Sequence, residues 1–329
     1  PRDKVTYHTL LHLTARAGRP EEAVRVLRQM KERRVARDQV TYHTMMSGYI
    51  EAQKWEFSLD ALDLMKEDGI TPTEETYCLC IQALGKVKNW EAAIAVYYRV
   101  VVKQKEVIPT AKIYSVLVDV LGEANQPKLA VEYFQIMNST GVQPDLHAFN
   151  ILLSALSKNR KMEEAEFWLS QIKTAGLVPD DYSYNIILNG FAEEGNVDRM
   201  WDVLEQMQTD EIEENEFVFN ALLKGCRHSK NWDMVPLVLE RQEAAGIPLD
   251  NVGYNTLLTA KTRQGRVGEA TELLQTMKDA NVKPDIITYN ILISAFVESK
   301  LWKMALNFFD EAINAGLVPD ALTLRGALT

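Results

Sequence analysis

The residues that most often carry catalysis or bind metal are scattered in this chain. The five histidines show no metal-ligand spacing: His8, His12, His43, His147 and His228. The signatures of a serine hydrolase elbow, a phosphate-binding P-loop and a zinc deaminase do not occur in the sequence. Acidic pairs near expected helix starts are explained by their favourable interaction with the helix dipole. We therefore expect no enzyme activity, no metal and no cofactor in this sequence.

Asparagine, in contrast, recurs at a fixed interval and always after an aromatic residue. The positions are Asn150, Asn185, Asn220, Asn255 and Asn290, spaced 35 residues apart. An asparagine amide offers both a donor and an acceptor, so it could hydrogen-bond the edge of a nucleobase. Asparagine is also a good helix N-cap, which makes a capping role the alternative interpretation.

Composition indicates a folded protein of an ordinary kind. The chain has 329 residues, 47% hydrophobic and 25% charged, with three cysteines and a formal net charge of −10. Three sparse cysteines indicate neither disulfides nor a good metal site, and they fit a reducing compartment. The acidic balance argues against a protein that coats nucleic acid indiscriminately, although a local basic groove is compatible with it. The chain starts at Pro1 without Met and stops soon after a new repeat opens, so we expect it to be a fragment of a longer protein.

The elements that must position these residues are internal repeats. The chain divides into nine units: 4–38, 39–73, 74–110, 111–145, 146–180, 181–215, 216–250, 251–285 and 286–320, with a tenth beginning at 321 and cut off at 329. Each unit has the apolar periodicity of two amphipathic helices, and a fixed period of this size predicts a solenoid. Gly176 is predicted to be a left-handed helix C-cap, and Pro236 to kink or shorten the start of the second helix of its unit. The two extra residues in 74–110 are expected to lengthen the second helix or the turn near 101–106.

The period and the motifs resemble one family of helical repeats. Units open on patterns such as Thr288-Tyr289-Asn290 and close on patterns such as Gly316-Leu317-Val318-Pro319-Asp320. Tetratricopeptide and ankyrin repeats differ in period and signature. The chain is similar over 4–329 to the pentatricopeptide repeat family, in its pure 35-residue subtype. This resemblance implies an all-α fold, a right-handed α-solenoid superhelix of helix-turn-helix repeats.

The same resemblance implies a single-stranded RNA ligand, read at one base per repeat. The fifth and the last residue of each repeat then select the base. The fifth residues are Ser115, Asn150, Asn185, Asn220, Asn255 and Asn290. The last residues are Asp145, Asp180, Asn215, Asp250, Asp285 and Asp320. Four Asn/Asp pairs favour uracil, Asn185 with Asn215 favours cytosine over uracil, and Ser115 with Asp145 favours guanine; the first three repeats carry uncommon pairs and are unassigned.

Two further positions have roles in the family. The second residues clamp the base between neighbouring repeats: His147, Tyr182, Phe217, Val252, Ile287 and Leu322. At the third repeat the clamp would consist of Glu75 and Lys112, which is poorly suited to a base. The thirteenth residues face the phosphates when they are basic: Arg16, Lys86, Lys158, His228 and Arg263. Acids occupy this position at Glu51, Glu123, Glu193 and Glu298, so modest phosphate binding is expected.

The resemblance therefore predicts sequence-selective binding of pyrimidine-rich single-stranded RNA, mainly by repeats five to nine. By the family's habit it implies a chloroplast or mitochondrion and a part in RNA processing, stability or translation. The alternative is a protein scaffold within an organellar ribosome or transcription complex, with repeats one to four as the protein-binding part. No membrane partner is expected, because no stretch approaches about 20 apolar residues.

Overall fold

The protein is described by a computed structural model, which covers residues 3–103 and 108–318. The predicted all-helical fold is confirmed, since these residues form eighteen α-helices and no strand. The first helices of the nine units are α1 (Lys4–Arg16), α3 (Gln39–Glu51), α5 (Glu74–Lys86), α7 (Ala111–Glu123), α9 (Leu146–Lys158), α11 (Asp181–Glu194), α13 (Glu216–Ser229), α15 (Asn251–Arg263) and α17 (Ile286–Glu298). The second helices are α2 (Pro20–Glu32), α4 (Glu56–Glu67), α6 (Trp90–Tyr97), α8 (Pro127–Ser139), α10 (Met162–Thr174), α12 (Val197–Thr209), α14 (Val235–Ala244), α16 (Val267–Asp279) and α18 (Trp302–Asn314).

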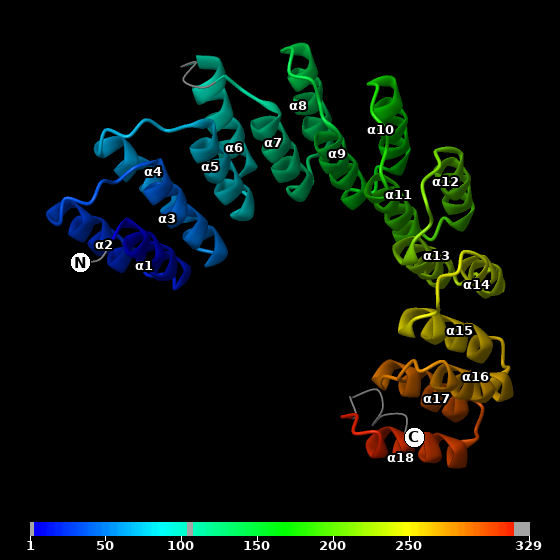
Figure 1. Ribbon diagram of the computed structural model, residues 1–329. Coiled ribbons are helices and arrows are strands. Elements are labelled where there is room, and N and C mark those ends of the chain that lie inside the picture. The colour runs from blue at the N-terminus through cyan, green and yellow to red at the C-terminus, as the bar shows by residue number, and fades with distance from the viewer. Residues whose placement is uncertain (1–2, 104–107, 319–329) are drawn as a thin grey trace. The chain divides into compact units, whose positions relative to one another are not determined.

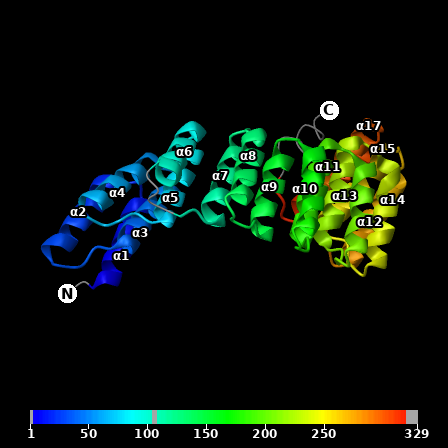
Figure 2. The ribbon, with the colours of Figure 1, turned by 90° about the horizontal axis from the view of Figure 1, so that it is seen from above.

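The chain divides into two compact units, residues 1–179 and 180–329. In the first unit α1, α3, α5, α7 and α9 pack side by side in chain order, as do α11, α13, α15 and α17 in the second. Each second helix packs on the first helix of its own repeat, and within a unit most also pack on the first helix of the next. The result in each unit is a layer of first helices and a layer of second helices (Figure 1), and Figure 2 shows the helices of the first unit following one another in chain order. We call the outer side of the first-helix layer the first-helix face.

Close packing of neighbouring first helices depends on small residues. A Cβ added to Gly48 on α3 would lie 2.6 Å from the Cβ of Ala15 and 3.0 Å from the carbonyl oxygen of His12. Gly176 has a φ of 78°, which confirms the predicted left-handed conformation after α10. The first-helix layer is therefore held at a separation that a larger side chain at Gly48 would disturb.

The two irregular repeats behave as their sequences predict. Pro236 lies in the first turn of α14, which begins at Val235 after a short 3₁₀ turn, η2 (Trp232–Met234). The second helix is thus shortened at its start because proline cannot donate the hydrogen bond of a helix interior. In the third repeat α6 continues as a π-helix, η1 (Tyr98–Lys103), which takes up part of the insertion, while 104–107 lie outside the described residues. No helix in the described ranges combines the length and apolar character needed to cross a bilayer.

Candidate nucleic-acid interface

The last residue of each repeat is the N-cap of the next first helix. Asp145, Asp250 and Asp285 accept hydrogen bonds from the backbone N–H groups of Ala148, Gly253 and Thr288 at 2.8, 2.9 and 2.9 Å. Asn215 does the same for Val218 at 3.2 Å, and Asp180 also caps its helix. Helix capping, which the sequence offered as the alternative role of the fifth-position asparagines, is therefore performed by the last residues of the repeats. Asp320 lies outside the described residues.

The fifth residues lie one turn inside the first helices, and two of them contact their predicted partners. Asn220 donates from Nδ2 to Oδ2 of Asp250 at 3.3 Å, and Asn255 donates from Nδ2 to Oδ1 of Asp285 at 3.2 Å. Residues 30 positions apart in the chain are thus joined by a hydrogen bond in each of these repeats.

The other predicted pairs differ from these two. Within the described residues no hydrogen bond joins Asn185 to Asn215. The amide of Asn215 instead donates from Nδ2 to Oδ2 of Asp181 at 3.3 Å. Ser115 is buried and makes no hydrogen bond to Asp145 in the part of the chain that the structure covers. Asn150 is buried and belongs to the first unit, whereas Asp180 belongs to the second.

A third column of residues, which the sequence analysis missed, contacts the fifth residue. Thr288, the third residue of its repeat, donates from Oγ1 to Oδ1 of Asn255 at 2.7 Å. The Oγ1 atoms of Thr41 and Thr76 lie 3.1 and 2.7 Å from Nε2 of His8 and His43. The signal was present in the opening motifs, where a threonine recurs two residues before the fifth position.

The predicted clamp residues of the second unit are exposed although they are large and apolar. Tyr182, Phe217, Val252 and Ile287 keep 58, 62, 44 and 56% of their surface accessible. His147 in the first unit is also exposed, and Leu322 lies outside the described residues. Exposed apolar side chains at one position of successive repeats indicate a binding surface, because burying them in a folded monomer would be favourable.

At the third repeat the clamp position is closed by an ion pair. Lys112 donates from Nζ to Oε1 of Glu75 at 3.2 Å. A base at this repeat would have to separate the two charges. That cost makes the third repeat a weaker candidate for base binding than the repeats with apolar clamp residues.

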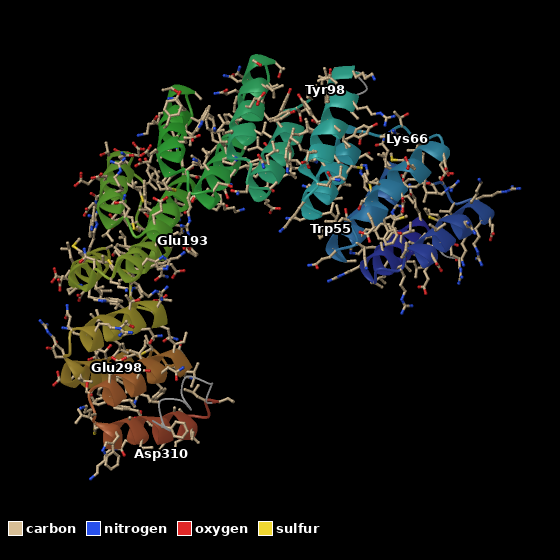
Figure 3. The ribbon with its side chains drawn as sticks, turned by 180° about the vertical axis from the view of Figure 1, so that it is seen from behind. Trp55, Lys66, Tyr98, Glu193, Glu298 and Asp310 are labelled. Carbon is tan, nitrogen blue, oxygen red and sulfur yellow. The ribbon has the colours of Figure 1, made fainter. Side chains whose placement is uncertain are left out.

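Four of the five predicted phosphate-binding residues lie beside a glutamate at the thirteenth position of a neighbouring repeat. Three are ion pairs: Arg16–Glu51 at 3.3 Å, Lys86–Glu123 at 2.8 Å and Arg263–Glu298 at 3.9 Å. His228 lies 3.8 Å from Glu193, a contact that is ionic only when the imidazole is protonated. Lys158 has no ion pair with a described residue. Glu193 and Glu298 lie near the ends of α11 and α17 (Figure 3). Because first helices stack in register, opposite charges at one position meet, and the phosphate row is largely neutralised.

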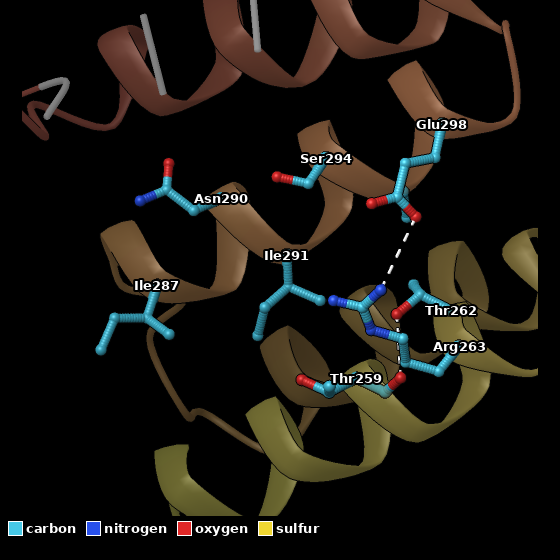
Figure 4. A pocket seen from close by; sticks show the side chains of 9 residues that line it. Thr259, Thr262, Arg263, Ile287, Asn290, Ile291, Ser294 and Glu298 are labelled. Carbon is cyan, nitrogen blue, oxygen red and sulfur yellow. Dashed lines mark hydrogen bonds and ion pairs between the residues drawn. The ribbon is translucent and has the colours of Figure 1, made fainter. Parts of the chain in front are cut away.

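One cavity brings three kinds of predicted residue together. It measures about 310 Å³ and lies between α15 and α17, lined by Ile287, Asn290 and Arg263 among others. Figure 4 shows these side chains with the Arg263–Glu298 ion pair at the rim of the cavity. The cavity therefore combines an apolar surface, an amide and a cation on the first-helix face of the second unit.

In the second and third repeats burial keeps the fifth residue uncharged. Burial lowers the pKa of His43, although Glu75 opposes the shift. Burial raises the pKa of the Cys78 thiol to about 12. Both side chains are therefore held neutral at pH 7. In the described ranges, no group of three or more His, Cys, Asp or Glu could hold a metal ion.

Comparisons with known proteins agree with this geometry. A model of the PPR repeat family matches residues 2–51, 37–86, 249–298 and 284–328, and a model of the pentacotripeptide-repeat region of PRORP matches 77–245. The chain is similar to the pentatricopeptide repeat protein PPR10 in complex with an 18-nt psaJ RNA element, at 25% identity and a TM-score of 0.52 over 100% of this chain. It spans about half of that relative, 51% of its length.

Two further solved structures are more distant. PPR10 from maize shows 21% identity and a TM-score of 0.47 over 99% of this chain and 56% of that one. The PPR domain of Arabidopsis thaliana protein-only RNase P 1 in complex with tRNA shows 19% identity and a TM-score of 0.45 over 53% of this chain and 91% of that one. Curated proteins give no match.

Proposed function

Because this chain belongs to the pentatricopeptide repeat family, we propose that its repeats bind single-stranded RNA on the first-helix face, without catalysis by the repeats themselves. A solved relative matched over 100% of this chain is a pentatricopeptide repeat protein in complex with RNA, which supports this proposal. Repeats five to nine are the principal reader. The bases are pyrimidines, mainly uracil, and the site of action is a chloroplast or mitochondrion.

One observation carries the proposal. In repeats seven and eight the fifth residue is hydrogen-bonded to the last residue, and exposed Phe217, Val252 and Ile287 stand at the clamp positions around them. An apolar clamp gains affinity by stacking, and a positioned amide discriminates by hydrogen bonding. The exposed apolar side chains add nothing to packing of the monomer, and with the positioned amides they match the needs of a base.

The test compares RNAs under identical salt. Fluorescence anisotropy should show that oligo-U binds more tightly than oligo-A, and that Asn220→Ala with Asn255→Ala removes most of the preference. Asn189→Ala is the matched control, because its exposed amide donates to the backbone of its own helix at 2.9 Å. Equal binding of both RNAs, with the double variant indistinguishable from the control, would refute the proposal.

A protein scaffold is the second candidate, and it is favoured by repeats one to four. There the Glu75–Lys112 pair closes a clamp and two thirteenth-position cations are paired with glutamate. Val5 and Val40 nevertheless leave apolar surface exposed at their clamp positions. Partners that stay bound to immobilised protein after nuclease treatment, and are lost on Val40→Asp, would support this function.

A further inference from the structure

We propose that the third residue of the following repeat decides how the base-selecting asparagine presents its amide, and thereby how strictly uracil is preferred to cytosine. The proposal deepens the RNA-binding function and rests on it. The third residues concerned are Thr288, which faces Asn255 of repeat eight, Val218, which faces Asn185 of repeat six, and Gly253, which faces Asn220 of repeat seven. We assign them an indirect role: they position the asparagine and do not themselves touch the base.

In repeat eight both ends of the amide are fixed. Oδ1 of Asp285 accepts hydrogen bonds from the backbone N–H of Thr288 at 2.9 Å and from Nδ2 of Asn255 at 3.2 Å. The Thr288 hydroxyl has one proton to donate and lies 2.9 Å from Oδ1 of Asp285 and 2.7 Å from Oδ1 of Asn255, so we assign the proton to the shorter contact with Asn255. Turning the amide over would place its oxygen against the carboxylate, which cannot donate. Thr288 is fully buried and Asn255 is 9% exposed, so water cannot replace these contacts easily.

In repeat six no hydrogen bond between described residues fixes the oxygen of the amide. Val218 stands where Thr288 stands in repeat nine and has no hydroxyl. Oδ1 of Asn185 is buried without a hydrogen-bond partner among the described residues. The two amide orientations thus differ little in energy, because neither satisfies the buried end. Repeat seven is intermediate, since Asp250 holds Nδ2 of Asn220 but Gly253 offers no hydroxyl.

The orientation matters because the two pyrimidines differ at one edge position. Uracil carries an acceptor, O4, where cytosine carries a donor, the N4 amino group, as thymine and cytosine do in DNA. An amide held with its oxygen inward has only N–H left for the base and prefers uracil. An amide that turns can present either end and accepts both bases.

The same contact occurs elsewhere in the chain with another side chain. Thr41 and Thr76 hold Nε2 of His8 and His43 from the corresponding position. A threonine hydroxyl at the third position therefore contacts the fifth residue of the preceding repeat at three places in the chain. The contacted side chain is a histidine at two of them and an asparagine at the third. This recurrence indicates a feature of the repeat geometry.

The test measures a ratio of affinities. Two U-rich RNAs are compared that differ only in U or C opposite repeat eight, and two more that differ opposite repeat six. Wild-type protein should prefer U to C by about tenfold or more at repeat eight. At repeat six, where Asn215 replaces the aspartate and the pair favours cytosine over uracil, it should show no preference for U. Thr288→Val should lower the ratio at repeat eight, Thr288→Ser should restore it, and Val218→Thr should raise the ratio at repeat six.

The control variant Thr271→Val and the gain-of-function variant Val218→Thr separate a specific effect on base preference from a general loss of stability. Thr271→Val removes the hydroxyl of a threonine on α16 that bonds only its own helix, and it should leave both ratios unchanged. If Thr288→Val unfolds, Val218→Thr decides, because it adds a hydroxyl in a fully buried space of the same shape. Unchanged ratios in folded variants that still bind oligo-U would overturn the inference; wild-type protein that shows no preference for oligo-U would instead overturn the proposed function.

Discussion

Replacing Glu193 and Glu298 together by glutamine should make RNA binding tighter at low salt and more sensitive to salt. Glu193 pairs with Lys224 at 2.5 Å and with His228 at 3.8 Å, and Glu298 pairs with Arg263 at 3.9 Å. Glu193, His228, Arg263 and Glu298 are thirteenth residues near the ends of first helices, where the family's phosphate contacts are expected, and Lys224 lies one turn earlier on α13. The substitutions remove two negative charges and release Lys224 and Arg263 from their acidic partners.

The magnitude follows from counterion release. Each phosphate neutralised on single-stranded RNA contributes about 0.7 to the slope of log affinity against log salt. Two released cations should therefore steepen the slope by about 1.4. The loss of stability should be small, because exposed ion pairs are worth about 1 kcal/mol or less each.

The assay is anisotropy of a labelled U-rich RNA over a salt series. Asp202→Asn with Glu22→Gln is the matched control, since it also removes two charges from ion pairs, and their partners Arg199 and Arg19 lie on the second helix α12 and at the N-cap of the second helix α2. The control slope should equal that of the wild type. A Glu193/Glu298 variant with the slope of the control would refute the reasoning that the phosphate row is self-neutralised. The same measurement on Glu51→Gln with Glu123→Gln shows whether RNA also passes repeats one to four.

Three further predictions concern stacking, packing and the thiols. Phe217→Ala should weaken RNA binding by about 1–3 kcal/mol, measured by anisotropy, whereas Phe167→Ala, an equally exposed phenylalanine on α10, should have no effect. Gly48→Ala should lower the free energy of unfolding by about 1–3 kcal/mol because its Cβ would meet backbone and Ala15, while Gly268→Ala, with nothing within 4 Å, should not; equal melting temperatures would contradict the packing argument. Burial raises the pKa to about 12 for Cys78 and Cys80 and about 11 for Cys226. Because the folded state holds these protons more tightly, stability should fall as pH rises above 9 toward 11, and thiol reagents at pH 8 should label the protein only after unfolding.

Local features of the fold were predictable because their causes are local. The apolar periodicity, Gly176 after α10 and Pro236 at the start of α14 act within a few residues, so the sequence alone indicates their outcome. The insertion of the third repeat was visible as extra length. Its form as a π-helix over Tyr98–Lys103 was not predictable, because a lengthened turn would accommodate the same residues.

The site was predictable as columns but not as contacts. Position in the repeat identified Asn255 and Asp285, yet the part of Thr288 depends on the geometry between neighbouring repeats. The acids of the thirteenth column were evident in the sequence. Their pairing with Arg16, Lys86 and Arg263 was missed, because residues 35 or more apart become neighbours only when helices stack in register.

The N-cap position of the last residue restricts how the specificity of this protein can change. Across the described repeats this position holds only aspartate, asparagine and threonine: Asp38, Thr73, Thr110, Asp145, Asp180, Asn215, Asp250 and Asp285. These are residues that begin a helix well, and alanine in their place costs about 1 kcal/mol. A residue suited to a different base but unable to cap would therefore lower the stability of the fold by about 1 kcal/mol. The set of residue types that can occupy this position is therefore limited by helix initiation as well as by any ligand.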